Sequence, residues 1–257
     1  MHNDFLPFLD PADVRPFVED DGEWVNLRFD YANIQSSMHK DDPFALELEY
    51  TRAMLLFMLF VPQPQRILMI GLGGGSLPKY CHRYLPQVDI TVVEINPHVI
   101  ALRDVFMVPA DSERFRVVKG DGAQFLASAT QRHDVILVDG FNFKGPAAEL
   151  ETAAFFAHCR AALEPSGVLV MNLDSEETGN GAAVARVREA FASDVFAMLA
   201  DGGTNRIVFA SDPALLRDAH HQAAQRLKAL DAVHQATLNR RSNTRERWPL
   251  LDDAPKP

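Results

Sequence analysis

"RILMIGLGGGSL", residues 66–77, is an apolar run followed by four glycines within five positions and then by polar, helix-like sequence. The run at 66–70 predicts a buried strand, and the sequence from residue 76 predicts a helix. A glycine turn between these elements lets the backbone approach a ligand closely, while the first turn of the helix offers unpaired N–H groups. We therefore interpret Gly71, Gly73 and Gly75 as a nucleotide-binding turn, although a tight packing turn has the same pattern.

On the C-terminal side of this turn, short apolar runs alternate with helical segments. The predicted strands lie at 66–70, 90–95, 115–120, 134–140, 167–173, 195–199 and 205–211, and the predicted helices at 76–85, 97–107, 122–130, 148–163 and 180–191. Apolar strands separated by helices are typical of a parallel sheet covered on both faces. We predict an α/β fold with a Rossmann-like sheet of the class I methyltransferase type, whose last strand follows a "DGG" turn and runs antiparallel.

The N-terminal side is organised differently. In "WVNLRF" (24–29) apolar and polar residues alternate, as in a half-buried strand, so residues 14–37 are predicted to form a small β hairpin or meander. A helix is predicted over 43–61, starting at Asp42-Pro43. We expect an N-terminal β element over 1–42, a nucleoside-binding domain over 43–240, which ends in helical sequence from 213, and a tail over 241–257.

The composition of the 257-residue chain narrows the function. It has 25 Lys and Arg against 35 Asp and Glu, a net charge of −10, which disfavours a nucleic-acid binder and favours encounter with a cationic small molecule. No apolar run is long enough for a membrane span, and the N-terminus lacks the basic region of a signal peptide. Two cysteines, Cys81 and Cys159, provide neither a disulfide framework nor a four-ligand zinc site. A cytoplasmic location without a metal is expected.

Two acidic residues extend the interpretation of the glycine turn. Glu94 ends the second predicted strand, where a carboxylate can accept both hydroxyls of a ribose. "KGDG" closes the third strand and puts Asp121, followed by Gly122, where a carboxylate can meet an adenine amino group. The third glycine of a dinucleotide motif is replaced by Ser76, which argues against an NAD enzyme. These residues predict a site of the S-adenosylmethionine type.

The fourth predicted strand carries the candidate for catalysis. It ends in "DVILVDGFNFKGP", so Asp139 lies at the carboxyl edge of the sheet, where ligands bind in open α/β folds.

These segments resemble the spermidine synthases, or polyamine aminopropyltransferases, from about residue 34 to residue 173. "ILMIGLGGGS", "VVEINPHVI" and "VVKGDGAQFL" are similar to the family's glycine loop, acid-bearing strand and adenine segment. In "DVILVDGFNFKGPAAELETAAFFAHCRAALEPSGVLV", Asp139 matches the first acid of the family's Asp-Ser-Ser/Thr-Asp-Pro-x-Gly-Pro loop. Gly145-Pro146, Phe155-Phe156 and "LEPSG" follow in register.

The resemblance implies a homodimer that moves an aminopropyl group from decarboxylated S-adenosylmethionine to an amine. A primary amine with a pKa of about 10.4 is mostly protonated at neutral pH, so a carboxylate such as Asp139 would orient it and accept its proton. Gln35 lies near the position of a family glutamine that contacts the donor. Tyr50 and Asn142 fall at positions expected to contact the substrate.

Three family positions differ in this chain. The aspartate of the glycine loop, which holds the donor's ammonium, is Gly74; the second acid of the catalytic loop is Asn142; and Tyr-His-Glu is Tyr50-Thr51-Arg52. Arg52 is either a partner for a substrate carboxylate or a surface arginine. Four nearby acids have two interpretations, as replacements for the lost ones or as an exposed helix start: Asp41, Asp42, Glu47 and Glu49.

Two other functions remain open at this point. One is a methyltransferase that uses intact S-adenosylmethionine, with Gly74 making room for the donor's carboxylate. The other is a binding protein that has kept the nucleoside site and lost turnover.

Overall fold

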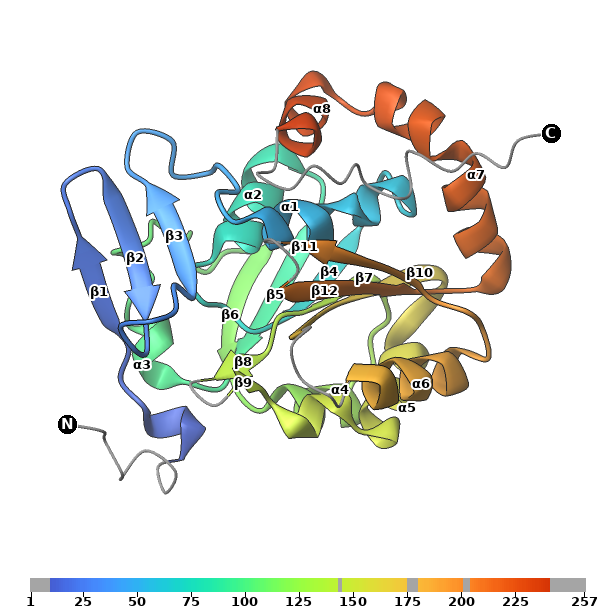
Figure 1. Cartoon of the computed structure of the whole chain (residues 1–257), viewed down its shortest axis with the longest axis horizontal. Helices are drawn as coiled ribbons and strands as arrows, with labels where there is room; N and C mark the ends of the chain where they lie inside the picture. The colour runs from blue at the N-terminus through green and yellow to red at the C-terminus, as the bar shows by residue number, and fades with distance from the viewer. Residues whose placement is uncertain (1–9, 143–144, 175–179, 201–203, 241–257) are drawn as a thin grey trace.

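A seven-stranded sheet forms the centre of the computed structural model, which describes residues 10–142, 145–174, 180–200 and 204–240 (Figure 1). Its strands are β4 (Arg66–Ile70), β5 (Asp89–Glu94), β6 (Phe115–Lys119), β7 (His133–Val138), β10 (Leu163–Asp174), β11 (Phe196–Ala200) and β12 (Asn205–Ala210). They lie in the order β11-β12-β10-β7-β4-β5-β6. Strand β12 runs antiparallel to both of its neighbours, β10 and β11. The predicted fold class, including the antiparallel last strand, is confirmed.

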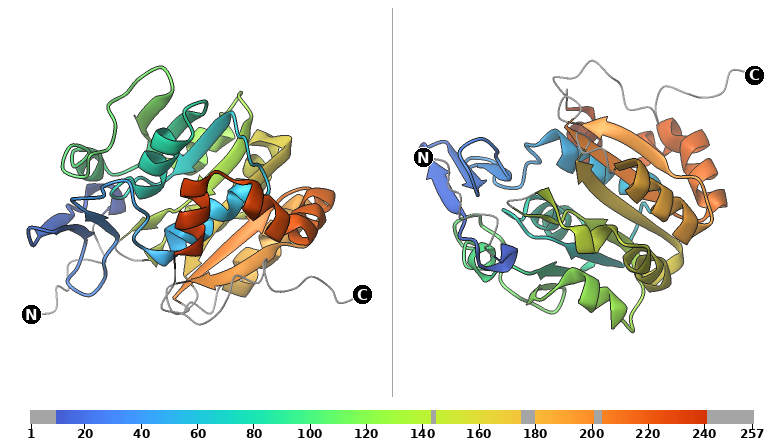
Figure 2. Two further views of the ribbon diagram at one scale, coloured as in Figure 1. Left: turned by 90° about the horizontal axis from the view of Figure 1, so that it is seen from above. Right: turned by 60° about the horizontal axis from the view of Figure 1, so that its bottom comes forward.

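Helices cover both faces of this sheet, as the two views of Figure 2 show. One layer holds α1 (Glu49–Leu55), η3 (Leu56–Leu59), α2 (Ser76–Tyr84), α7 (Pro213–Ala229) and α8 (Ala232–Asn239). The other holds α4 (Gly122–Ala127), α5 (Ala153–Ala162) and α6 (Asn180–Phe191). Alternate residues of β4 face the two layers, since Ile67 and Met69 belong to the first buried cluster and Leu68 and Ile70 to the second. This explains why the strand is apolar throughout.

A small antiparallel sheet precedes the main one. It consists of β1 (Phe17–Asp20), β2 (Trp24–Arg28) and β3 (Ser36–His39), after the short turn η2 (Pro11–Asp13). It is the predicted meander, and Figure 1 shows it beside α2 and α3 (Pro97–Ile100). The Asn96 amide Nδ2 donates to the Val14 carbonyl over 2.7 Å, which ties the start of the chain to the loop after β5. The domain boundary at residues 42 and 43 stays a prediction.

Several predicted helices have other bounds in the structure. The first begins at Glu49 instead of 43, because Asp42 forms a turn in which its carbonyl accepts a bond from the Ala45 N–H. The segment 97–107 is helical only to Ile100 and continues as turns that end at Met107, which has a φ of +53°. The segment 213–240 divides at Leu230, whose extended backbone ends α7.

The helix predicted over 148–163 also divides. A short turn, η4 (Ala148–Glu151), is followed by α5, and the Thr152 hydroxyl accepts a bond from the Phe155 N–H at the start of α5. Strand β10 then begins at Leu163, earlier than the predicted residue 167, with an irregularity before Val168. Between β7 and η4, two short strands, β8 (Phe141–Asn142) and β9 (Gly145–Pro146), pair with each other.

The register of the central strands determines which residues lie side by side at the carboxyl edge of the sheet. Ile70 pairs with Val93 on one side and with Val138 on the other. Val138 in turn pairs with Met171. The residue after each of these four therefore stands in one row at the carboxyl edge; the row consists of Gly71, Glu94, Asp139 and Asn172. We call these four residues the edge row.

Candidate active site

The glycine loop after β4 has the backbone that its sequence predicts. Gly71, Gly73 and Gly75 have φ angles of +94°, +52° and +68°, values that favour glycine strongly. Gly71 also has no room for a side chain, because an added Cβ would lie 2.1 Å from the Asp139 carbonyl oxygen. Gly75 stands at the N-cap of α2. The loop is thus pressed against the end of β7 and directs the start of α2 toward the edge row.

Gly74 is also closely packed, but against side chains of other segments. A Cβ at this position would lie 2.7 Å from Ser36 Oγ and 2.8 Å from a ring carbon of Phe106. The space into which the family's aspartate would extend is therefore filled by β3 and by the turn after α3. The idea that the missing acid at Gly74 makes room for a donor's carboxylate stays a prediction.

Glu94 lies at one end of the edge row, on β5 next to Gly71, and is buried, with 8% of its surface exposed. Its Oε2 accepts from the Leu72 N–H and its Oε1 from the Asn96 N–H, both over 2.8 Å. Burial raises the pKa of Glu94, and the charge of Asp139 adds to the rise. Each carboxylate oxygen can accept a second bond, so Glu94 is held rigidly and keeps acceptor capacity for a diol.

Ile95 and Asp121 border the same region. Ile95 follows Glu94 and is 44% exposed, an apolar side chain that a flat ring can cover. Asp121 is the N-cap of α4, and its Oδ1 accepts from the N–H groups of Ala123 (2.7 Å) and Gln124 (3.0 Å). Among the described residues its Oδ2 has no partner. Gly122 has a packing role, because a Cβ there would lie 2.3 Å from a methyl carbon of Ile70.

Asp139 is joined to a chain of amides. The Asn172 Nδ2 donates to Asp139 Oδ1 over 2.9 Å, and the Asn205 Nδ2 donates to Asn172 Oδ1 over 3.0 Å. The Asp139 N–H also donates to the Ile70 carbonyl over 2.9 Å, which fixes the backbone at the end of β7. The sequence interpretation missed both asparagines, although Asn172 near the end of an apolar strand was a usable signal.

Gln35 and Tyr50 lie together beside the glycine loop. The Tyr50 hydroxyl donates to the Gln35 carbonyl over 3.5 Å, and the neighbouring Ser36 reaches the loop through a 3.5 Å contact with Ser76. Ser36 was not predicted as a site residue. The backbone of Asn142 pairs with Gly145 in β8 and β9. The loop residues 143 and 144, next to it, lie outside the described residues.

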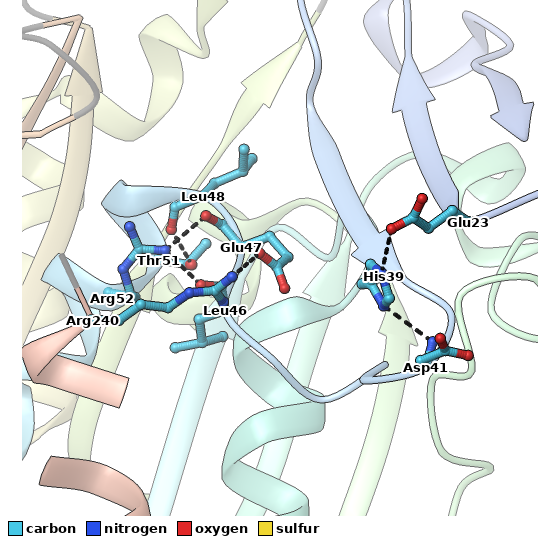
Figure 3. A network of polar contacts seen from close by, with 9 residues as sticks. All are labelled: Glu23, His39, Asp41, Leu46, Glu47, Leu48, Thr51, Arg52 and Arg240. Carbon is cyan, nitrogen blue, oxygen red and sulfur yellow. Dashed lines mark hydrogen bonds and ion pairs between the residues drawn. The ribbon is translucent and has the colours of Figure 1, made fainter. Parts of the chain in front are cut away.

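The segment before α1 corrects one of the two interpretations of Arg52, the surface arginine, while the other, a partner for a substrate carboxylate, stays a prediction (Figure 3). Arg52 is buried, with 5% exposed, and its Nη1 donates to the carbonyls of Leu46 and Glu47 over 2.7 Å each. It is therefore not a surface arginine, and its bonds to these carbonyls shape the chain ahead of the helix. The Glu47 carboxylate pairs with Arg240 over 2.8 Å, and Glu49 is buried.

His39 and Asp41 are drawn in the same view, near Glu23 (Figure 3). His39 Nε2 contacts Glu23 over 3.1 Å, and its Nδ1 accepts from the Asp41 N–H over 3.2 Å (Figure 3). Asp41 and Asp42 are exposed. These contacts order the end of the small sheet.

Three other features concern residues outside the edge row: the two cysteines, groups of potential metal ligands and the apolar length of the helices. Cys81 and Cys159 are buried core residues, as expected. Within the described ranges, no cluster of three or more His, Cys, Asp or Glu side chains could hold a metal. None of the helices in that part of the chain is long and apolar enough to cross a membrane.

Lys79 provides a first testable prediction. It lies on α2 with 1% of its surface exposed, and its Nζ donates to the Phe106 carbonyl (2.7 Å) and contacts Met38 Sδ (3.2 Å). Burial lowers the pKa of Lys79 from 10.5 to about 8. Between these two pH values the unfolded chain binds a proton that the folded protein does not. The free energy of unfolding should therefore rise with pH across this window.

Lys79→Met removes this contribution. We expect the stability of the wild type, relative to this variant, to increase from pH 8 to pH 10.5 in urea unfolding curves. Subtracting the variant cancels the other groups that titrate in this range. A difference that stays constant with pH would contradict the prediction.

Comparison with known proteins agrees with the geometry. The profile described as the spermine/spermidine synthase domain matches residues 47–197. A polyamine aminopropyltransferase from Chromobacterium violaceum is 37% identical over 213 residues, which cover 79% of this chain and 82% of that protein.

Solved structures share the fold. A probable spermidine synthase from Corynebacterium glutamicum superposes with a TM-score of 0.67 at 24% identity and covers 79% of this chain and 82% of its own. Human methyltransferase-like protein 13, in complex with SAH, superposes with a TM-score of 0.60 at 24% identity and covers 76% of this chain and 95% of its own.

Proposed function

Because the chain belongs to the spermine/spermidine synthase family, we propose that it transfers an aminopropyl group from decarboxylated S-adenosylmethionine to a small-molecule amine. The observation that carries the proposal is the edge row. It holds a glycine pressed against a strand end and two carboxylates, all within the segment that matches the family.

The nucleoside part of the donor fits three features of this edge. We propose that the Glu94 carboxylate accepts the ribose hydroxyls, since its backbone bonds fix its position and leave acceptor capacity. The adenine ring would cover the exposed face of Ile95, and its amino group would donate to Asp121 Oδ2. The glycine loop allows the sulfonium end to lie against the backbone.

Asp139 is the proposed base. The acceptor amine arrives protonated, and Asp139 would orient it and remove one proton, so that the nitrogen lone pair can attack the carbon next to the sulfonium. A carbon–nitrogen bond forms as the carbon–sulfur bond breaks, and the sulfur keeps the electron pair and leaves as methylthioadenosine. Much of the rate would come from holding the two reactants in line.

We propose that both the donor's ammonium and the acceptor are held differently from the family pattern. Gly74 replaces the acid for the donor's ammonium and Asn142 the second acid of the catalytic loop, while Glu47 and Arg52 are engaged in the segment before α1. Losing a charge-assisted bond costs on the order of 1.5–3 kcal/mol. We therefore propose weaker binding of long polycationic amines than of short amines, with Tyr50 and Asn142 bordering the acceptor.

The methyltransferase alternative stays second, because the matching family profile and the relatives of 36–37% identity are those of polyamine aminopropyltransferases. Its own argument, the absent acid at Gly74, is a prediction that the titration below tests. The non-catalytic alternative is disfavoured by Asp139, which keeps an ordered set of hydrogen-bond partners. A cytoplasmic location and a homodimer remain parts of the proposal.

The test is a calorimetric titration with decarboxylated S-adenosylmethionine, methylthioadenosine and intact S-adenosylmethionine. We expect the first two to bind and the third to bind more weakly, since the proposed donor is the decarboxylated form and methylthioadenosine is its product. Release of methylthioadenosine is then followed with a panel of monoamines, diamines and polyamines. Preferential binding of intact S-adenosylmethionine, with no product from any amine, would overturn the proposed function.

Asp121→Asn tests the adenine contact in the same titrations. Asparagine is as good an N-cap as aspartate, so the bonds to Ala123 and Gln124 are kept and α4 stays stable. The amide would turn its NH₂ toward the adenine amino group, so we expect methylthioadenosine to bind about 10- to 100-fold more weakly. Asp121→Ser, which also caps the helix, is the matched control for stability. Unchanged affinity in Asp121→Asn would remove this residue from the site.

A further inference from the structure

Asn172 lies beside Asp139 because β7 and β10 are adjacent parallel strands. Since Val138 pairs with Met171 in parallel, the next residues of β7 and β10 are neighbours in the edge row. Asn172 is 3% exposed, so its amide is withdrawn from water and depends on its protein partners. Its Nδ2 donates to Asp139 Oδ1 over 2.9 Å.

The orientation of the Asn172 amide is set from the opposite side. Asn205 begins β12, the antiparallel strand next to β10, and its Nδ2 donates to Asn172 Oδ1 over 3.0 Å. The Asn205 amide is oriented in turn by the Thr204 hydroxyl, which donates to its Oδ1 over 3.1 Å. Every donor in this series points toward Asp139. An Asn172 amide turned the other way would put its oxygen against a carboxylate and its NH₂ against another NH₂.

A neutral amide is a better hydrogen-bond donor to Asp139 than a cation would be if the acceptor is an ammonium ion. Burial is the main cause of the raised pKa of Glu94, and the negative charge of Asp139 adds a smaller rise. A neutral donor holds the Asp139 carboxylate in its ionised form without adding positive charge beside an ammonium acceptor. An arginine or lysine would bind the carboxylate more strongly but would repel the amine.

We propose that Asn172, oriented by Asn205, is a positioning residue that fixes the side-chain rotamer of Asp139 and lowers its proton affinity. This inference rests on the proposed function only for its effect on turnover. Its effect on the proton affinity of Asp139 is independent of which reaction the protein catalyses.

The sharpest variant is Asn172→Asp. It keeps the shape and the acceptor for Asn205, removes the donor to Asp139 and adds a negative charge beside that carboxylate, so Asn172→Ala is measured with it as the variant that removes the donor without the charge. With methylthioadenosine release as the assay, we expect kcat to fall 10- to 100-fold and the KM for the donor to change less than threefold. The acidic limb of the pH–rate profile should move to higher pH. Asn205→Ala should cause the same changes, reduced to about three- to tenfold in kcat, because Asn172 then loses only its orientation.

Ser211→Ala is the matched structural control. The Ser211 hydroxyl donates to the Gly167 carbonyl over 2.6 Å, so it joins the same part of the sheet away from the edge row. Its loss should lower the urea midpoint without changing the pH–rate profile. If Asn172→Asp also lowers only the midpoint, Asn172 is structural and the inference is overturned.

A second readout does not need activity. Carbon-13 NMR of the Asp139 carboxyl group follows its titration in the wild type, Asn172→Ala and Asn172→Asp. We expect the titration to shift to higher pH in both variants, whether or not the wild type transfers an aminopropyl group. Identical titration curves would overturn the inference even if the proposed function holds.

Discussion

Asp139→Asn should lower the turnover number about 10²- to 10⁴-fold while leaving donor affinity within about threefold. The amide oxygen of the new side chain can still accept from Asn172, so the edge row keeps its arrangement. It cannot remove a proton from an ammonium at neutral pH. Turnover is measured as methylthioadenosine release, and donor affinity by calorimetry.

Asp41→Asn serves as the control for this prediction. Asp41 is an exposed acid of the segment near the small sheet, and the same charge is removed there without touching the edge row. We expect its kcat to match that of the wild type. An Asp139→Asn protein that kept more than a tenth of the turnover would show that another group takes the proton.

Gly71→Ala should cause the largest loss of stability of any single methyl group at this edge, on the order of 3–5 kcal/mol. Part of the loss is conformational, because a φ of +94° strains an alanine. The rest is steric, because the added Cβ would lie 2.1 Å from the carbonyl oxygen of Asp139, a backbone atom of a residue whose N–H is bonded to the Ile70 carbonyl. The free energy of unfolding is measured in urea.

Gly22→Ala separates the two parts of this effect. Gly22 has a φ of +99°, and an added Cβ there meets no atom within 4 Å. It carries the conformational strain alone, so we expect a loss of about 1–3 kcal/mol. Equal losses in the two variants would mean that the end of β7 moves aside easily. In that case the glycine loop does not press on Asp139.

The outline of the fold could be predicted from the sequence, because alternating periodicity is a local property. The apolar run at 66–70 and the glycines after it place a strand, a turn and a helix without knowledge of the rest of the chain. The antiparallel last strand and the small N-terminal sheet were also predicted and are present. Element boundaries were less predictable. Asp42-Pro43 has the composition of a helix start, yet the chain forms a turn there and α1 begins at Glu49.

Contacts between distant segments could not be predicted in the same way. The neighbours of Gly74 are an example, because only the packing of β3 and of the turn after α3 places Ser36 and Phe106 against it. The interpretation of Arg52 as a surface arginine was wrong for the same reason, because the structure buries this side chain among backbone carbonyls.

The sequence by itself determined the residue types at the edge of the sheet, namely glycines after β4 and carboxylates after β5 and β7. These follow from the chain order, because a residue that directly follows a parallel strand must lie at its carboxyl end. Only the tertiary structure decided which neighbours these residues have. Strand register aligns Asp139 with Asn172, and the antiparallel β12 brings Asn205 to the same place from more than thirty residues away. Register depends on packing across the whole sheet, and no local stretch of sequence contains it.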